Sequence, residues 1–298
     1  MKSLTENIIT DLLKKQPASF KIFFWGLCKN AGKTTALLHT YATLKLFTNR
    51  PIIILSCGYD GEALDAITGL AKPQVMIKEN DYCITTDKFV SADTFQILHI
   101  ENRNAIYGKP VIAKAMQAAQ TTIATVGINV DIQRILQNET IPSYAIFLID
   151  GAINRKAFLE LSGKDDYISI SIGNGYADNV EAIKSEMLFI KKLFSLPFNP
   201  DVVQDCMLLD ATIAATLHNS IVVLKNNSHI FLSRKEYELF KRNGNSIVFA
   251  TPQPQILWFT FNPYDANRNK TGEDYTDLLN ETVQTIPVLN LKKEPVVC

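Results

Sequence analysis

Residues 22–35 read IFFWGLCKNAGKTT, an apolar run that leads through a short polar turn into Gly-Lys-Thr-Thr. The apolar run predicts a buried strand, and the Ala- and Leu-rich residues that follow predict a helix. A strand, a turn and a helix that begins at Gly-Lys-Thr form the context that a phosphate-binding loop requires. Backbone N–H groups at a helix N-terminus face an anion, and the helix dipole stabilises its negative charge.

This stretch predicts a site for a nucleoside triphosphate with Mg²⁺. Lys33 would be the catalytic group that reaches the β- and γ-phosphates, and the Thr34 hydroxyl would ligate Mg²⁺. Lys29 could stabilise transferred charge, in cis or across a dimer, or it could be an ordinary exposed lysine. The other predicted nucleotide-binding residues are Gly26, Asn30, Ala31, Gly32 and Thr35.

The glycine spacing departs from the usual pattern. That pattern places a glycine six residues before the lysine, where this chain has Leu27, and the chain's own glycine stands one residue earlier, at Gly26. The loop is therefore expected to be one residue longer at its start, or differently shaped.

A candidate metal-binding acid follows a second apolar run, YAIFLID at 144–150, which ends in Asp150. Such an acid holds Mg²⁺ in many nucleotide sites, often through water. An apolar run followed by Asp is common, so the pattern gains weight only beside the loop at Lys33. Both would then lie at the carboxyl ends of parallel strands, where open α/β sheets bind ligands.

A second acidic stretch, GYDGE at 58–62, follows the predicted strand PIIILS at 51–56. Asp60 and Glu62 could act catalytically by orienting water or sensing the γ-phosphate, or they could hold the metal. An ordinary solvent loop is an equally good interpretation. Arg155 and the lysine after it follow the candidate metal acid and could bind phosphate or a partner's carboxylate.

Composition excludes several classes of function. The 298 residues carry 30 basic and 30 acidic side chains, so a nucleic-acid partner is not indicated. The five cysteines show no metal-binding or disulfide pattern and fit a reducing cytoplasm. We see neither a signal peptide nor a run of about 18 apolar residues that would predict a membrane span.

Alternation of strand-like and helix-like segments predicts an α/β fold, P-loop NTPase-like, with a mainly parallel sheet flanked by helices. Residues 1–200 would form the nucleotide-binding domain, with a β-rich insertion at about 74–127. Residues 201–298 would be a small C-terminal α+β portion, packed on the same sheet or separate. Within it, residues 233–244 predict a helix with Ser233 as N-cap and Gly244 as its stop.

Five short stretches stand in an order that resembles one protein family: the P-loop reactivase subunit encoded beside lysine 5,6-aminomutase and ornithine aminomutases. They are KNAGKTT, GYDGE followed by AKP, LIDGAINRK, FTFNPY and TIPVLNL. The resemblance covers about residues 20–291. The first stretch is shared by many P-loop proteins, whereas its combination with the second and third is far more specific.

The resemblance implies an ATP- and Mg²⁺-dependent factor that keeps an adenosylcobalamin- and PLP-dependent aminomutase active by releasing or exchanging damaged cobalamin. It implies that aminomutase and a second reactivase subunit as partners. The family's site positions correspond here to 29–35, 60–62 and Asp150 with the following Asn154 and Arg155. The chain departs from the family at 56–59 (SCGY) and 172–179 (IGNGYADN), which affects the expected substrate or partner contacts most.

Two other functions fit the same loop. One is a small-molecule kinase or ligase of the dethiobiotin-synthetase kind, which would turn over without a protein partner. The other is a non-hydrolysing, nucleotide-dependent assembly module. ATP is favoured over GTP because no Asn-Lys-x-Asp stretch stands where a guanine-specificity loop would lie. A homodimer across the nucleotide is an analogy with other nucleotide switches.

Overall fold

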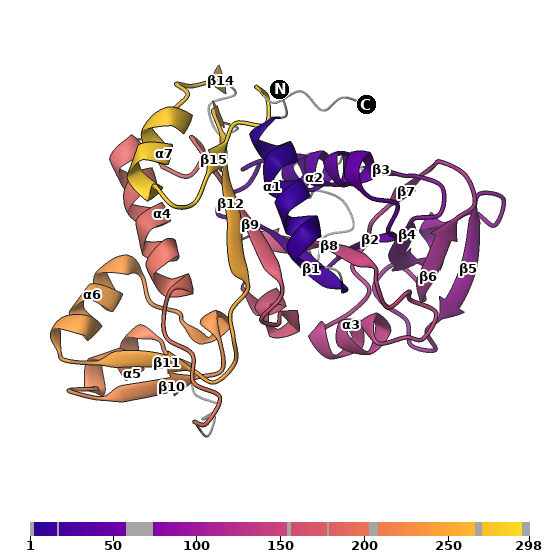
Figure 1. Cartoon of the computed structure of the whole chain (residues 1–298). Helices are drawn as coiled ribbons and strands as arrows, with labels where there is room; N and C mark the ends of the chain where they lie inside the picture. The colour runs from indigo at the N-terminus through magenta and orange to yellow at the C-terminus, as the bar shows by residue number, and fades with distance from the viewer. Residues whose placement is uncertain are drawn as a thin grey trace.

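The computed structural model describes residues 3–16, 18–57, 74–153, 156–177, 179–202, 208–265 and 270–293. The chain is α/β, with a nine-stranded central sheet of order β15-β12-β9-β1-β8-β2-β4-β6-β5 that helices flank (Figure 1). The strands of this sheet are β1 (Phe20–Gly26), β2 (Ile52–Ser56), β4 (Tyr82–Thr86), β5 (Phe95–Ile100), β6 (Pro110–Ala115), β8 (Ile146–Ile153), β9 (Tyr167–Gly173), β12 (Gln255–Asn262) and β15 (Val288–Leu289). All pairs from β15 to β4 are parallel, and the last two pairs, β4 with β6 and β6 with β5, are antiparallel.

Strand β1 lies inside the sheet between β8 and β9, and its sequence explains this place. Ile22 and Phe24 pack into the core on one face, and Phe23 and Trp25 pack into the core on the other. Successive side chains of a strand point to opposite faces, so a strand covered on both faces needs a continuous apolar run. The predicted buried strand is confirmed.

Helices cover both faces of the sheet. The helices α1 (Leu4–Lys15) and α2 (Lys33–Phe47) pack on the face of Ile22. The helices α3 (Asn129–Leu136), α4 (Val180–Phe194) and α7 (Thr276–Val283) pack on the face of Phe23. Figure 1 shows α4 and α7 side by side, and these two helices contact each other. The sheet is therefore the middle layer of three.

Residues 74–122 contain five strands. Three of them, β4, β6 and β5, extend the central sheet at one edge. The other two, β3 (Gln74–Ile77) and β7 (Ala119–Thr122), form a separate antiparallel pair.

A buried carboxylate connects α2 to the edge of the sheet. Asp81 is 1% exposed and accepts hydrogen bonds from Tyr41 Oη at 2.6 Å, Lys45 Nζ at 3.1 Å and the Ile52 backbone N at 3.0 Å. A buried charge is stable only when it is paired and hydrogen-bonded in this way. Asp81 thus fixes the start of β2 against the middle of α2.

Replacing Asp81 by alanine should lower the free energy of unfolding by about 3–5 kcal/mol, because it leaves the Lys45 ammonium buried without its partner. Urea denaturation followed by circular dichroism would measure the change. Asp93→Ala, which removes an exposed carboxylate bonded only to Ser91, is the matched control and should change stability by less than about 0.5 kcal/mol. Equal effects of the two substitutions would contradict the role of Asp81.

Residues 208–249 form a small unit with its own core against one end of α4. It contains α5 (Ala211–Thr216), β10 (Ile221–Leu224), the 3-10 helix η3 (Asn227–His229), α6 (Arg234–Arg242) and β11 (Ser246–Phe249). Helix α6 starts at Ser233 with a capping box, and Gly244 follows its end at φ 77°, so both predicted boundaries are confirmed. The chain then returns to the central sheet as β12.

Candidate functional site

The loop between β1 and α2 is held at both ends by backbone hydrogen bonds. Leu27 N donates to Ser171 O of β9 at 3.0 Å, and Ala36 N donates to Gly32 O at 2.9 Å as the first hydrogen bond of α2. Gly32 occupies the N-cap position at φ 98°, a conformation that a side chain would strain. The N–H groups of the first turn have no intrahelical partners, as in every α-helix. The N-cap residue is a glycine, so it offers no side chain to cap them.

Lys33 of this first turn contacts the carboxyl end of β8. Its Nζ lies 2.8 Å from Asp150 Oδ1 and also donates to Gly151 O. The pairing of β8 sets this geometry, since Asp150 is level with Phe24 of β1 and Ser56 of β2. The sequence predicts a strand that ends at Asp150. This boundary is wrong, because β8 continues to Ile153.

A pocket of about 440 Å³ opens over the loop. Its size is typical of small-molecule sites, which are roughly 300–1,000 Å³. The pocket collects the predicted nucleotide-binding residues of the first βα unit together with three others. Its lining consists of Gly26, Cys28, Lys29, Asn30, Ala31, Gly32, Lys33, Thr34, Thr35, Asn262 and Tyr264.

The pocket lies where the topology of the sheet changes direction. The chain leaves β1 through α2 toward β2 on one side, and it leaves β9 toward β12 on the other side. In open α/β sheets, ligands bind in the crevice outside the carboxyl ends of the strands at such a switch point. The loop therefore lies at the ligand-binding position of its architecture.

Sequence reasoning missed the contribution of β12. Asn262, at the carboxyl end of β12, donates from Nδ2 to Asn30 O in the loop at 2.8 Å. Its own backbone O accepts from Asn174 N, just after β9, at 3.1 Å. The stretch FTFNPY at 259–264 belongs to the resemblance described above, but it does not show that β12 lies two strands from β1.

Comparison of the chain with protein-family models, curated proteins and solved structures finds no match. Four predicted site residues, Asp60, Glu62, Asn154 and Arg155, lie outside the described residues.

The residues present fit a hydrated Mg²⁺. This ion prefers oxygen ligands and is usually held by one or two protein groups together with water and substrate phosphates. Thr34 is the second residue of α2, partly exposed in the pocket, and Asp150 supplies a carboxylate next to Lys33. Among the described residues, no cluster of three or more histidine, cysteine or acidic side chains offers an alternative metal site.

Two cysteines close to the loop are not activated. Burial raises the pKa of Cys28 to about 11 despite a hydrogen bond from Gly173. Burial and the nearby Asp150 raise the pKa of Cys57 to about 12, against the effect of Lys33. A thiol is nucleophilic as the thiolate, so both cysteines are neutral, unreactive side chains near pH 7.

In the part of the chain that the structure describes, no helix is both long and apolar enough to cross a membrane.

If the loop binds nucleotide as the sequence predicts, replacing Asn262 by alanine should weaken that binding by about twofold to tenfold, because one hydrogen bond that fixes the loop is worth about 0.5–1.5 kcal/mol. Titration with a fluorescent ATP analogue would measure this. Asn199→Ala, which changes an exposed asparagine whose side chain accepts a hydrogen bond from Asp201 N, should leave the affinity unchanged. If Asn262→Ala binds the analogue as tightly as the unaltered chain, the anchor has no functional role.

Proposed function

We propose that the chain binds and hydrolyses Mg·ATP in the pocket over the loop 26–35. One observation carries the proposal: the uncapped N-terminus of α2 and the Lys33–Asp150 pair, at 2.8 Å, stand together at the switch point of the sheet. The free N–H groups and the helix dipole suit a phosphate. A lysine and an acid with separate roles toward phosphate and metal suit phosphoryl transfer.

In this proposal the Lys33–Asp150 pair holds both side chains ready before the nucleotide arrives. Both are largely buried, with 17% and 24% of their side-chain surfaces exposed, so neither can move far. The triphosphate would then be the counterion of Lys33, and Asp150 together with Thr34 would hold Mg²⁺. Bound Mg²⁺ neutralises charge that develops on the phosphate oxygens. Asp60 or Glu62 would orient the attacking water.

We further propose that hydrolysis serves a partner enzyme. The resemblance to the reactivase subunit of lysine 5,6-aminomutase and ornithine aminomutase systems supports a role in keeping an adenosylcobalamin-dependent aminomutase active. A second reactivase subunit, a homodimer across the nucleotide and a cytoplasmic location belong to the same proposal. The equal numbers of basic and acidic side chains give no support for a nucleic-acid partner.

The test is ATP turnover by the purified chain, alone and with an adenosylcobalamin-dependent aminomutase that has been inactivated by turnover. Stimulation of ATP hydrolysis together with recovery of aminomutase activity supports the proposal. Turnover that depends on a small metabolite and ignores the aminomutase indicates a kinase or ligase instead. Tight ATP binding with background turnover in both conditions indicates an assembly module.

A further inference from the structure

A second and larger pocket, of about 690 Å³, lies on the α4 face of the sheet. The strand β1 contributes Trp25 to its wall, and the next residue but one, Leu27, also lines it. Apolar side chains of α4 and of the segment after η3 form most of the remaining wall, including Phe189, Ile190, Leu193, Ile230 and Leu232. This pocket and the nucleotide pocket thus open on opposite sides of the same loop.

One polar group in this wall has nothing to bond. Trp25 is 6% exposed, and its Nε1–H has no hydrogen-bond partner among the described residues. A buried donor without a partner costs roughly 1–3 kcal/mol, and the indole N–H of a buried tryptophan usually finds an acceptor.

A buried ammonium lines the same pocket. Lys156 Nζ donates to Asn227 Oδ1 at 3.1 Å and to Ile230 O at 2.8 Å, so two of its three protons are given to neutral acceptors. Burial lowers the pKa of Lys156 to about 8, although Glu186 acts in the opposite direction. Near neutral pH the pocket therefore holds a poorly compensated positive charge.

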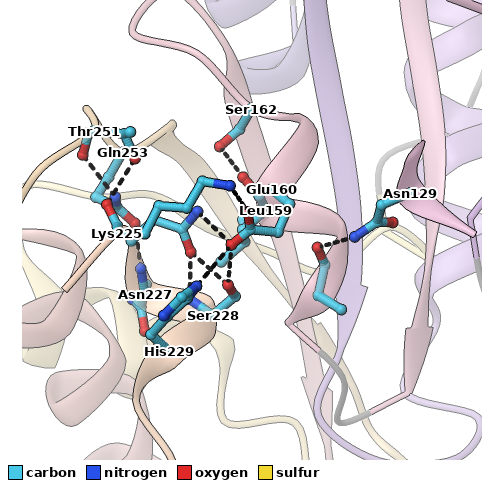
Figure 2. A network of polar contacts seen from close by, with 12 residues as sticks. Asn129, Leu159, Glu160, Ser162, Lys225, Asn227, Ser228, His229, Thr251 and Gln253 are labelled. Atoms are coloured by element: carbon cyan, nitrogen blue, oxygen red, sulfur yellow. Dashed lines mark hydrogen bonds and ion pairs between the residues drawn. The ribbon is translucent and has the colours of Figure 1, made fainter. Parts of the chain in front are cut away.

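The acids of the pocket are already engaged. Figure 2 shows Glu160, on the 3-10 helix η2 (Ala157–Leu161), facing Lys225, Ser228 and His229. Glu160 accepts from Lys225 Nζ, from Ser228 Oγ at 2.8 Å and from Asn226 Nδ2 at 2.9 Å, and His229 Nε2 lies 3.2 Å from it. Burial alone would raise the pKa of Glu160, but the first three bonds outweigh it and lower the pKa.

The second acid, Glu186 of α4, is also engaged. It bonds the phenol of Tyr176, whose pKa is raised by burial and by this carboxylate. Both acids of the pocket therefore have a donor of the chain beside them, Lys225 for Glu160 and Tyr176 for Glu186, whereas the two hydrogen bonds of Lys156 go to neutral acceptors.

We propose that this pocket is a binding site for a small apolar carboxylic acid, whose carboxylate accepts from Lys156 Nζ and whose hydrocarbon body packs between α4 and the segment after η3. Two carboxylates of the chain, Glu160 and Glu186, line the same space and would repel a dianion such as phosphate. The apolar walls would leave a small, fully polar anion without packing. The site does not depend on the proposed function at the loop.

The test uses 3-phenylpropionate as the probe, with 3-phenylpropionamide and 3-phenylpropylamine as its neutral and cationic counterparts. Isothermal titration of the whole chain should give one site for the carboxylate and binding at least about tenfold weaker for the other two. Tight binding of the amide would overturn the proposal, because it would show a purely apolar pocket. Absence of binding by the carboxylate would overturn it as well.

Substitutions then locate the site. Lys156→Met should weaken carboxylate binding by about tenfold to a hundredfold. Lys164→Met is the matched control, since Lys164 belongs to the same β8–β9 connection and is exposed. If Lys156→Met and Lys164→Met bind the probe equally, the assignment is wrong.

The pH dependence of carboxylate binding distinguishes a lysine that contacts the ligand from one that only stabilises the fold. As pH rises through about 8, free Lys156 loses its proton, and affinity for the carboxylate should fall. Glu160, Glu186, Tyr176 and His229 also line the pocket, so the comparison with Lys156→Met identifies the part that belongs to Lys156. The decline between pH 7 and 9 should disappear in that variant, and its persistence would contradict the proposal.

Discussion

Lys33→Ala is expected to reduce ATP turnover by at least about a hundredfold, the usual cost of removing one preorganised group that stabilises transition-state charge. Alanine removes the ammonium that lies 2.8 Å from Asp150 Oδ1. In the proposed function the ammonium of Lys33, in the first turn of α2, contacts the phosphates, and this contact is lost in the variant. Steady-state release of phosphate from Mg·ATP would measure the change.

The control for this substitution is Lys14→Ala, because Lys14 lies on α1 and forms a solvent-exposed ion pair with Asp11. It should leave turnover within about twofold, since an exposed pair contributes at most about 1 kcal/mol to stability. Thermal unfolding of both variants would show whether the fold is intact. Equal turnover by Lys33→Ala and the unaltered chain would end the nucleotide assignment, whatever the result for the second pocket.

Gly173→Ala is expected to destabilise the fold by about 2–4 kcal/mol and to weaken nucleotide binding at the same time. A Cβ atom on residue 173 would lie 2.3 Å from Asn262 O and 3.2 Å from Asn262 Cβ. A backbone atom cannot rotate away, so the carboxyl ends of β9 and β12 must separate, and overpacking of this kind usually costs a few kcal/mol. The displaced Asn262 would then lose its hydrogen bond to Asn30 in the loop.

Chemical denaturation and titration with a fluorescent ATP analogue would measure the two effects. Gly163→Ala is the matched control, because a Cβ atom there would meet only Asp166 Oδ2, at an ordinary 3.6 Å. It should leave both quantities close to those of the unaltered chain. A Gly173→Ala protein that is as stable and binds nucleotide as tightly as this control would show that the two strands separate without cost.

Local sequence features predicted the parts of the fold that depend on near neighbours. The strand at β1, the helix that begins at Lys33, and the boundaries of α6 at Ser233 and Gly244 follow from periodicity and capping within a dozen residues. The α/β class followed from the alternation of such segments, and the large, mostly parallel sheet confirms it.

Features that depend on distant segments were not predictable in the same way. Asn262 reaches the loop because β12 pairs with β9, and no periodicity near residue 262 encodes that pairing. The second pocket brings Trp25 of β1 together with Lys156 and with residues 228–232 after β10. Each of these side chains looks ordinary in its own segment, and only the long-range packing turns them into a site.

The hydrogen bond from Asn262 to the loop spans 232 positions of the chain, and this separation has a consequence for protein synthesis. A ribosome adds about 5–20 residues per second. Roughly 10–50 s therefore pass between the synthesis of the loop and the synthesis of Asn262. A nascent chain that already contains the whole first βα unit would still lack the strand that holds the loop in shape. The hydrogen bond that anchors the loop can therefore form only after β12 has been synthesised, and products truncated before Asn262 should lack it.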